Sequence, residues 1–124
     1  MITKESAIEK TLHRAGRVLL ALLFFAGAMQ KMANPDPAMG LLIARGLPGW
    51  LIWPALVFNG VAGVALIAGW ALRPLGLALA AYCIFTSWFH FIPSDPWQMS
   101  ILVKNWAIAG GCLILAAGAS GRNR

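Results

Sequence analysis

Four long apolar runs, joined by short polar connections, set the main limit on what this sequence can fold into. They cover about residues 15–32, 50–72, 75–91 and 97–119. Each is close to the ~20 residues that a helix needs to cross the hydrocarbon core of a bilayer. Because lipid offers the backbone no hydrogen-bond partners, such runs are expected to be helical. The sequence therefore predicts an all-α membrane protein with four transmembrane helices.

The composition supports a membrane location. The chain has 124 residues, of which 60% are hydrophobic and only 11% are charged, whereas soluble domains are about half apolar and about a quarter charged. A soluble domain of this size has too much surface to hide such an excess. We therefore expect residues 1–124 to form one transmembrane domain, with no room for a second.

The basic residues predict how the chain is oriented. The net charge is +6, but the positive residues flank the apolar runs, so we expect contacts with membrane lipids rather than nucleic acid. One side of the membrane would carry three of them, Lys31, Arg45 and Lys104. The other side would carry seven: Lys4, Lys10, Arg14, Arg17, Arg73, Arg122 and Arg124. The positive-inside rule then places both termini in the cytoplasm of a bacterial inner membrane. Short loops make neighbouring helices antiparallel, so the prediction is an up-down-up-down bundle.

Three smaller features complete this outline. The first 13 residues are polar and mixed in charge, which favours a short amphipathic helix on the membrane surface. Residues 38–44 are apolar but too short to span, so an interfacial or re-entrant piece is expected. Cys83 and Cys112 lie within apolar runs without the spacing of a metal site. We expect them to be small buried hydrophobes and expect no metal ligands.

Small residues predict where the helices approach each other closely. Gly60 and Gly63 lie in the second run, and Gly110 and Gly111 lie in the fourth. Small side chains let the backbones of membrane helices come near each other. Asn59, near the middle of the second run, is expected to form an interhelical hydrogen bond.

Polar residues are expected to gather at the outer end of the bundle. They are Lys31, His90, Asp95, Lys104 and Asn105. Lys104 lies seven residues after Trp97, which is ~10 Å along a helix. Ionisable groups at such depths are costly and mark candidate functional sites, and a histidine can change charge near neutral pH. The set predicts an outer pocket for a quinone head group, an anionic substrate or a lipid head group.

Each of these residues also has a structural interpretation. Lysines near helix ends extend toward the interface, and His90 could be an interfacial anchor beside Trp88. Asp95 precedes Pro96 at the start of the fourth run, where it could cap the helix. The sequence leaves both interpretations open.

Several motifs, taken in order, resemble the DoxX family of small four-span bacterial membrane proteins. They are the run from Arg17 to Gly27 followed by Lys31, the segment Arg45-Gly-Leu-Pro48 leading into Asn59, Gly60 and Gly63, and finally His90 with the pair Lys104-Asn105. The resemblance covers about residues 14–119. It implies a four-helix fold and a link to redox or quinone chemistry, since the family name comes from a subunit of a thiosulfate:quinone oxidoreductase. Family members often carry a glutamate where this chain has Asn59, so a proton-carrying carboxylate is missing here.

The first functional hypothesis is a membrane subunit of a redox assembly. Its cofactor would be a quinone, contacted by Lys31, His90, Lys104 and Asn105, with Asp95 orienting His90 or Lys104. A redox-enzyme subunit or further copies of the chain would be its partners. One alternative is a non-catalytic scaffold or assembly factor that docks into a larger complex, and another is a small transporter or channel component. The sequence leaves open whether the chain is an enzyme.

Overall fold

Four long helices make up most of the chain in the computed structural model, which describes residues 6–122. A short helix and two 3₁₀ turns join them. In chain order the elements are α1 (Ala7–Ala33), α2 (Asp36–Ala44), η1 (Gly49–Leu51), α3 (Ile52–Ala68), α4 (Leu72–Ser87), η2 (Trp88–His90) and α5 (Pro96–Arg122). Four segments are long and apolar enough to cross a membrane: Ala7–Ala33, Gly49–Ala68, Leu72–His90 and Pro96–Ala119. The predicted all-α, four-span fold is confirmed.

Two helix boundaries differ from the sequence prediction. Ser6 and Glu9 form a capping box, in which the Glu9 amide donates to Ser6 Oγ at 3.1 Å and the Ser6 amide donates to Glu9 Oε1 at 2.8 Å. This cap starts α1 at Ala7, and no proline interrupts it before Ala33. Residues 7–13 therefore belong to the first long helix rather than to a separate surface helix, and residues 1–5 lie outside the described part. Helix α3 ends earlier than expected because Gly69 adopts φ 75°.

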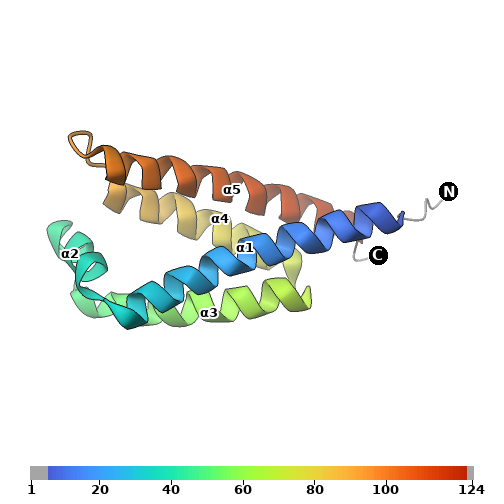
Figure 1. Cartoon of the computed structure of the whole chain (residues 1–124), viewed down its shortest axis with the longest axis horizontal. Coiled ribbons are helices and arrows are strands. Elements are labelled where there is room, and N and C mark those ends of the chain that lie inside the picture. The colour runs from blue at the N-terminus through green and yellow to red at the C-terminus, as the bar shows by residue number, and fades with distance from the viewer. Residues whose placement is uncertain (1–5, 123–124) are drawn as a thin grey trace.

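The helices are arranged as two antiparallel pairs (Figure 1). Helix α1 packs mainly against α3, and α4 packs mainly against α5. The two pairs lie close together at the end where α1 begins and α5 ends. They diverge toward the opposite end, where α2 stands between them. We call this opposite end the α2 end, and it is the end predicted to face outward.

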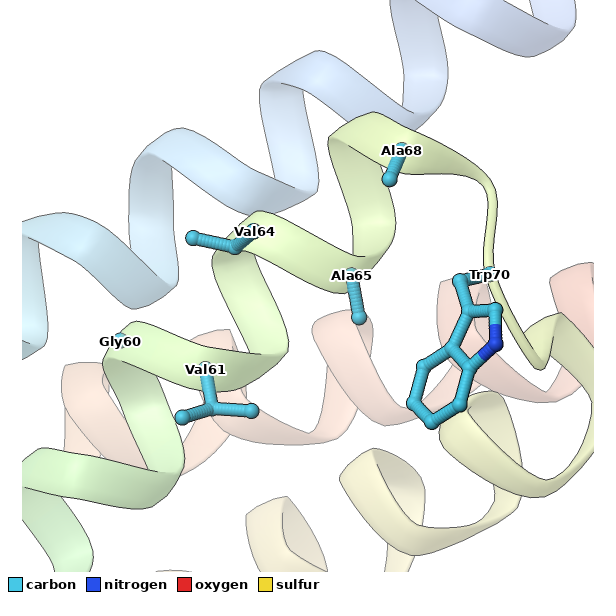
Figure 2. A pocket seen from close by; sticks show the side chains of 6 residues that line it. All are labelled: Gly60, Val61, Val64, Ala65, Ala68 and Trp70. Atoms are coloured by element: carbon cyan, nitrogen blue, oxygen red, sulfur yellow. The ribbon is translucent and has the colours of Figure 1, made fainter.

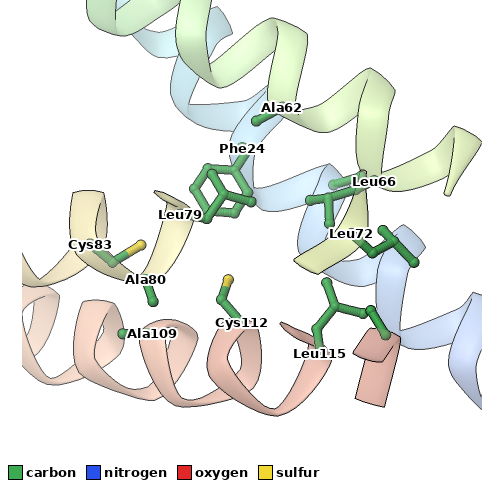
Figure 3. Packing of buried hydrophobic residues seen from close by; sticks show 12 residues of the cluster. Phe24, Ala62, Leu66, Leu72, Leu79, Ala80, Cys83, Ala109, Cys112 and Leu115 are labelled. Carbon is green, nitrogen blue, oxygen red and sulfur yellow. The ribbon is translucent and has the colours of Figure 1, made fainter. Parts of the chain in front are cut away.

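The core lies where the two pairs meet (Figure 3). All four long helices contribute side chains to one buried cluster, whose labelled members are Phe24, Ala62, Leu66, Leu72, Leu79, Ala80, Cys83, Ala109, Cys112 and Leu115. Both cysteines are free thiols in this cluster. Most of these residues are small or branched, which suits closely spaced helices.

Glycines allow the close approach of helices at two positions. A Cβ on residue 63 would lie 2.6 Å from the Phe25 ring, and one on residue 76 would lie 2.7 Å from the Cys112 carbonyl oxygen. Gly76 was not singled out from the sequence. At Gly60 and Gly110 a Cβ would meet no atom within 4 Å among the described residues, and at Gly111 it would only touch Leu20 at 3.9 Å. Within one chain, Gly63 and Gly76 are therefore the glycines that close packing requires.

Helix α2 is tied to the far helix pair by Arg45, which follows its last turn. Nη2 of Arg45 donates to the carbonyl oxygens of Trp88 at 2.8 Å and Phe91 at 3.0 Å. The guanidinium also lies 5.2 Å from the centre of the Trp88 ring, within the range of a cation–π interaction. The two carbonyls lie at the end of a helix, where backbone donors are few, and the Trp88 carbonyl also accepts the Phe91 amide at 3.3 Å. Arg45 thus satisfies these groups and links the two helix pairs across the α2 end.

The outer surface of the bundle is apolar, as a lipid-facing surface must be. All six tryptophans are exposed, and most of them lie near helix ends, as expected for interfacial aromatic residues. A shallow groove of about 450 Å³ runs along α3 (Figure 2), lined by Gly60, Val61, Val64, Ala65, Ala68 and Trp70. A second groove of about 320 Å³ is lined by residues of α4 and α5, with Arg73 among them. The groove along α3 has the apolar lining expected of a surface covered by lipid chains, whereas Arg73 makes the second groove partly polar.

The contact at Gly76 predicts that Gly76→Ala destabilises the protein. The new methyl group would meet a backbone oxygen of α5, so α4 and α5 would have to separate, at a cost of about 1–3 kcal/mol. Gly110→Ala is the matched control, because the added methyl group enters open space and alanine favours the helix. Thermal unfolding in detergent measures both. Equal unfolding temperatures for the two variants would contradict the packing described here.

The charge distribution predicts that the α2 end faces the periplasm. A cysteine introduced as Ser94→Cys, near that end, should react in intact cells with a membrane-impermeant maleimide. One introduced as Lys10→Cys, at the other end, should react only after lysis, because basic ends stay in the cytoplasm. Both positions are exposed, and the native cysteines are buried. The reverse labelling pattern would show that the chain has the opposite orientation.

Candidate functional site

Three basic residues from three elements lie at the α2 end. Lys31 is in the last turn of α1, His90 ends η2, and Lys104 is in the third turn of α5, eight residues after Pro96. Lys31 and His90 are half-buried, whereas Lys104 is exposed. We call Lys31, His90 and Lys104 the basic cluster. Three of the five residues predicted to bind a ligand therefore lie at the same end of the bundle.

Lys31 points back into the bundle rather than out toward the membrane surface. Side chains of a helix lean toward its N-terminus, and for Lys31 that direction leads away from the α2 end. Its Nζ and the Oδ1 of Asn59 each lie 3.7 Å from the point where a Cβ on Gly27 would stand. Lys31 is half-buried. Its ammonium and the Asn59 amide therefore lie over the same glycine, between α1 and α3.

Asn59 extends this polar region to α4. Only 3% of its surface is exposed, and its Oδ1 accepts a hydrogen bond from the Tyr82 hydroxyl at 3.3 Å. The Tyr82 ring in turn packs on Phe58, with 5.0 Å between the ring centres. Lys31, Asn59 and Tyr82 thus form a line of polar groups that runs from α1 through α3 to α4.

His90 is held by a residue that the sequence analysis did not single out. Its Nδ1 lies 2.6 Å from Oε1 of Gln98 in the first turn of α5. Because an amide oxygen can only accept, Nδ1 is the donor in this contact. When the ring is neutral, Nε2 is then the atom that can accept a hydrogen bond or a proton. This contact fixes the orientation of a titratable ring beside two lysines.

Asp95 caps α5. Its Oδ1 accepts hydrogen bonds from the backbone amides of Trp97 at 3.0 Å and Gln98 at 3.3 Å. These amides belong to the first turn of the helix, where a negative side chain is favourable. The carboxylate oxygen is therefore engaged by the helix terminus, and the ring that it was expected to orient is instead bound by Gln98.

Asn105 faces the interface between α4 and α5. It is 9% exposed, and its Nδ2 donates to Oγ1 of Thr86 at 3.4 Å. The Thr86 hydroxyl donates to the carbonyl oxygen of Tyr82 at 2.9 Å. Asn105 thus belongs to a separate polar contact, which holds α4 and α5 together. It follows Lys104 in the sequence but lies on another face of α5.

The position of Gln98 explains why it was missed. It follows Asp95 by three residues, the spacing at which a glutamine usually bonds back to the capping residue. Here the Asp95 amide donates to the Ile92 carbonyl at 2.9 Å, and the Gln98 side chain turns to His90. Tyr82, as an isolated phenol in an apolar run, gave only a weak signal in the sequence.

The basic cluster is distinct from the two grooves on the outer surface, since neither groove has Lys31, His90 or Lys104 in its lining. Within residues 6–122, no three histidine, cysteine or acidic side chains are grouped so that they could hold a metal ion. The chemistry on offer is two ammonium groups, an oriented imidazole, and the amide and phenol groups of Asn59 and Tyr82. Such a set can donate hydrogen bonds to oxygen atoms and exchange a proton.

Two comparisons relate this chain to known proteins. The sequence profile of the DoxX family matches residues 13–92. The inner membrane protein YqjF of Escherichia coli strain K12 is 26% identical over 101 residues, which cover 81% of this chain and 78% of YqjF. No solved structure shows significant similarity.

The hydrogen bonds of Asp95 predict a mainly structural role for this carboxylate. Asp95→Ala should lower the free energy of unfolding by about 1 kcal/mol, the usual value of an N-terminal cap. Asp95→Asn should keep most of the stability, since asparagine also caps helices well. Thermal unfolding in detergent gives the comparison. Equal destabilisation by the two substitutions would show that the negative charge matters rather than the cap.

Proposed function

Because the chain belongs to the DoxX family and its four apolar helices make it a multi-pass bacterial inner-membrane protein, we propose that its basic cluster binds a small polar ligand. The ligand that we favour is a quinone head group. In this proposal the chain is the membrane subunit of a redox assembly, and a partner subunit supplies or removes the electrons.

The observation that supports this proposal is that Lys31, His90 and Lys104 all lie at one end of the bundle. Charged groups inside the membrane region are costly, and they are usually found where they bind or transfer something. Lys31 bears this cost most clearly, because its ammonium points into the bundle beside Asn59. A lysine with a purely interfacial role would extend toward water instead.

The chemistry of the cluster suits a quinone. The carbonyl oxygens of a quinone ring accept hydrogen bonds, which the ammonium groups of Lys31 and Lys104 can donate. Reduction to the quinol takes up protons, and the imidazole ring of His90, oriented by Gln98, is a group that can exchange one at Nε2. The isoprenoid tail of the ligand would remain in the surrounding lipid. The two helix pairs diverge at the end of the bundle that carries the cluster, and such a ligand would enter between them (Figure 1).

A second candidate function is a scaffold within a larger membrane complex. It is favoured by Gly60, which lines the exposed groove on α3 and has open space in front of it. Gly110 on α5 is open in the same way. Glycines that no helix of the same chain uses could let a helix of another protein approach closely.

The quinone proposal predicts that the purified protein carries a quinone and that the basic cluster holds it. After isolation in mild detergent, solvent extraction and mass spectrometry should detect a stoichiometric quinone. Lys104→Ala and His90→Ala should each reduce it about tenfold or more, because each removes a charged or polar contact to the ligand. Lys10→Ala, at the other end of the bundle, is the control and should retain the quinone.

A preparation without quinone, but with a fixed partner protein, would favour the scaffold function. In that case Gly60→Leu or Gly110→Leu should release the partner, whereas Lys104→Ala should not. Retention of the quinone by both cluster variants would contradict the proposed site.

A further inference from the structure

We propose that the inner end of the site, over Gly27, binds a hydroxyl group of the ligand, so that the site prefers a quinol to the corresponding quinone. This inference rests on the proposed function, because it concerns the same site, and it names the form of the ligand that the site favours. A quinol carries ring hydroxyl groups where the quinone carries carbonyl oxygens. A hydroxyl group both donates and accepts a hydrogen bond, whereas a carbonyl oxygen only accepts.

The first argument is the space over Gly27. The nearest side-chain atoms to the place where a Cβ would stand are Asn59 Oδ1 and Lys31 Nζ, each at 3.7 Å. These are ordinary contact distances, so a group the size of a methyl fits there without displacing either side chain. The space lies where α1 packs on α3. A ligand atom that enters it meets the ammonium of Lys31 and the amide oxygen of Asn59 together.

The second argument is the chemistry of the two groups that face this space. The ammonium of Lys31 can only donate hydrogen bonds, and the amide oxygen of Asn59 can only accept them. Any ligand oxygen that Lys31 binds over Gly27 therefore lies beside an acceptor. A hydroxyl group satisfies both neighbours, because its oxygen accepts from Lys31 and its hydrogen is donated to Asn59. A carbonyl oxygen would accept from Lys31 but would leave two acceptors facing each other.

The third argument is that Tyr82 fixes the orientation of the Asn59 amide. Only 3% of the Asn59 surface is exposed, and its Oδ1 accepts a hydrogen bond from the Tyr82 hydroxyl at 3.3 Å. An amide oxygen has two lone pairs, so one acceptor position remains for the ligand. If the amide turned over, the hydrogen bond that the phenol donates would be lost. Tyr82 is therefore a positioning residue, which keeps an acceptor turned toward Gly27.

The test compares the affinity of the full chain for the two forms of one ligand. The protein is placed in nanodiscs of phosphatidylcholine, whose head group has no hydroxyl group to compete. It is titrated by calorimetry with a short-chain benzoquinone and, in the absence of oxygen, with the corresponding quinol. The quinol should bind about tenfold more tightly or better, because it gains a hydrogen bond and leaves no acceptor unpaired. Equal affinities, or tighter binding of the quinone, overturn the inference, since water rather than a ligand hydroxyl would then occupy the space.

Gly27→Ala fills the space with a methyl group and should lower the affinity for the quinol about tenfold or more. The fold should be kept, because the methyl group meets no side-chain atom closer than 3.7 Å and alanine favours the helix. Gly16→Ala in the same helix is the matched control, since a Cβ there meets no described atom within 4 Å, and it should bind both forms as the wild type does. Wild-type affinity for the quinol in Gly27→Ala overturns the inference.

Tyr82→Phe removes the hydroxyl group that orients the amide and keeps the ring that packs on Phe58. The Asn59 amide can then turn over and offer a donor to a carbonyl oxygen. The preference for the quinol should therefore disappear, while the affinity for the quinone is kept or raised. A purely structural role of Tyr82 would weaken both forms equally, so an unchanged ratio of the two affinities overturns the inference.

The same titrations separate this inference from the proposed function. Binding of both forms without a preference leaves the proposed function in place and contradicts the hydroxyl site. A protein that binds neither form contradicts the proposed function, and the hydroxyl site with it.

Discussion

The absence of water in the bilayer is the constraint on which this structure depends. Every polar group in the membrane region must find its partner within the chain, and the helices satisfy the backbone by themselves. Polar side chains follow the same rule: Ser87 Oγ donates to the Cys83 carbonyl at 2.7 Å, and Thr86 Oγ1 donates to the Tyr82 carbonyl. At the end of η2, Arg45 donates hydrogen bonds to the carbonyl oxygens of Trp88 and Phe91. Within the described residues, the buried side-chain atoms without a hydrogen-bond partner are both ring nitrogens of His13 and Nε of Arg17, near the start of α1.

The lysines of the basic cluster are placed differently from the other polar residues of this region. The hydrogen bonds of Asn59, His90, Asp95 and Asn105 are made with neighbouring residues of the chain. Lys31 is half-buried with its ammonium over Gly27, and Lys104 is exposed. The cluster also lies at the end where the two helix pairs diverge and α2 is inserted between them (Figure 1). Close packing near Gly76 holds α4 against α5, and α1 packs mainly against α3. In the proposed function, a ligand would enter between the two pairs rather than within either of them.

Membership of the DoxX family establishes the fold more firmly than the chemistry, because one fold can carry several functions. In this structure Asn59 is neutral, buried and bonded to Tyr82. The resemblance implied a glutamate at this position in other family members. In this chain the neighbour of Lys31 is therefore a neutral amide rather than a carboxylate.

The number, approximate positions and apolar character of the spans followed from the sequence alone, because lipid requires about 20 apolar residues in each helix. The capping role of Asp95 was also among the interpretations that the sequence offered, since caps depend on residues close in the chain. Other features required the tertiary structure. Four glycines were predicted to pack, yet only Gly63 makes a close contact, while Gly76 opposite Cys112 was missed. The rotation and pairing of the helices decide which face of each helix meets its neighbour. They also decide that Gln98 contacts His90 and that Lys31 points inward. The four spans are apolar on nearly every face, so their sequence cannot specify that rotation, and only the packed bundle decides it.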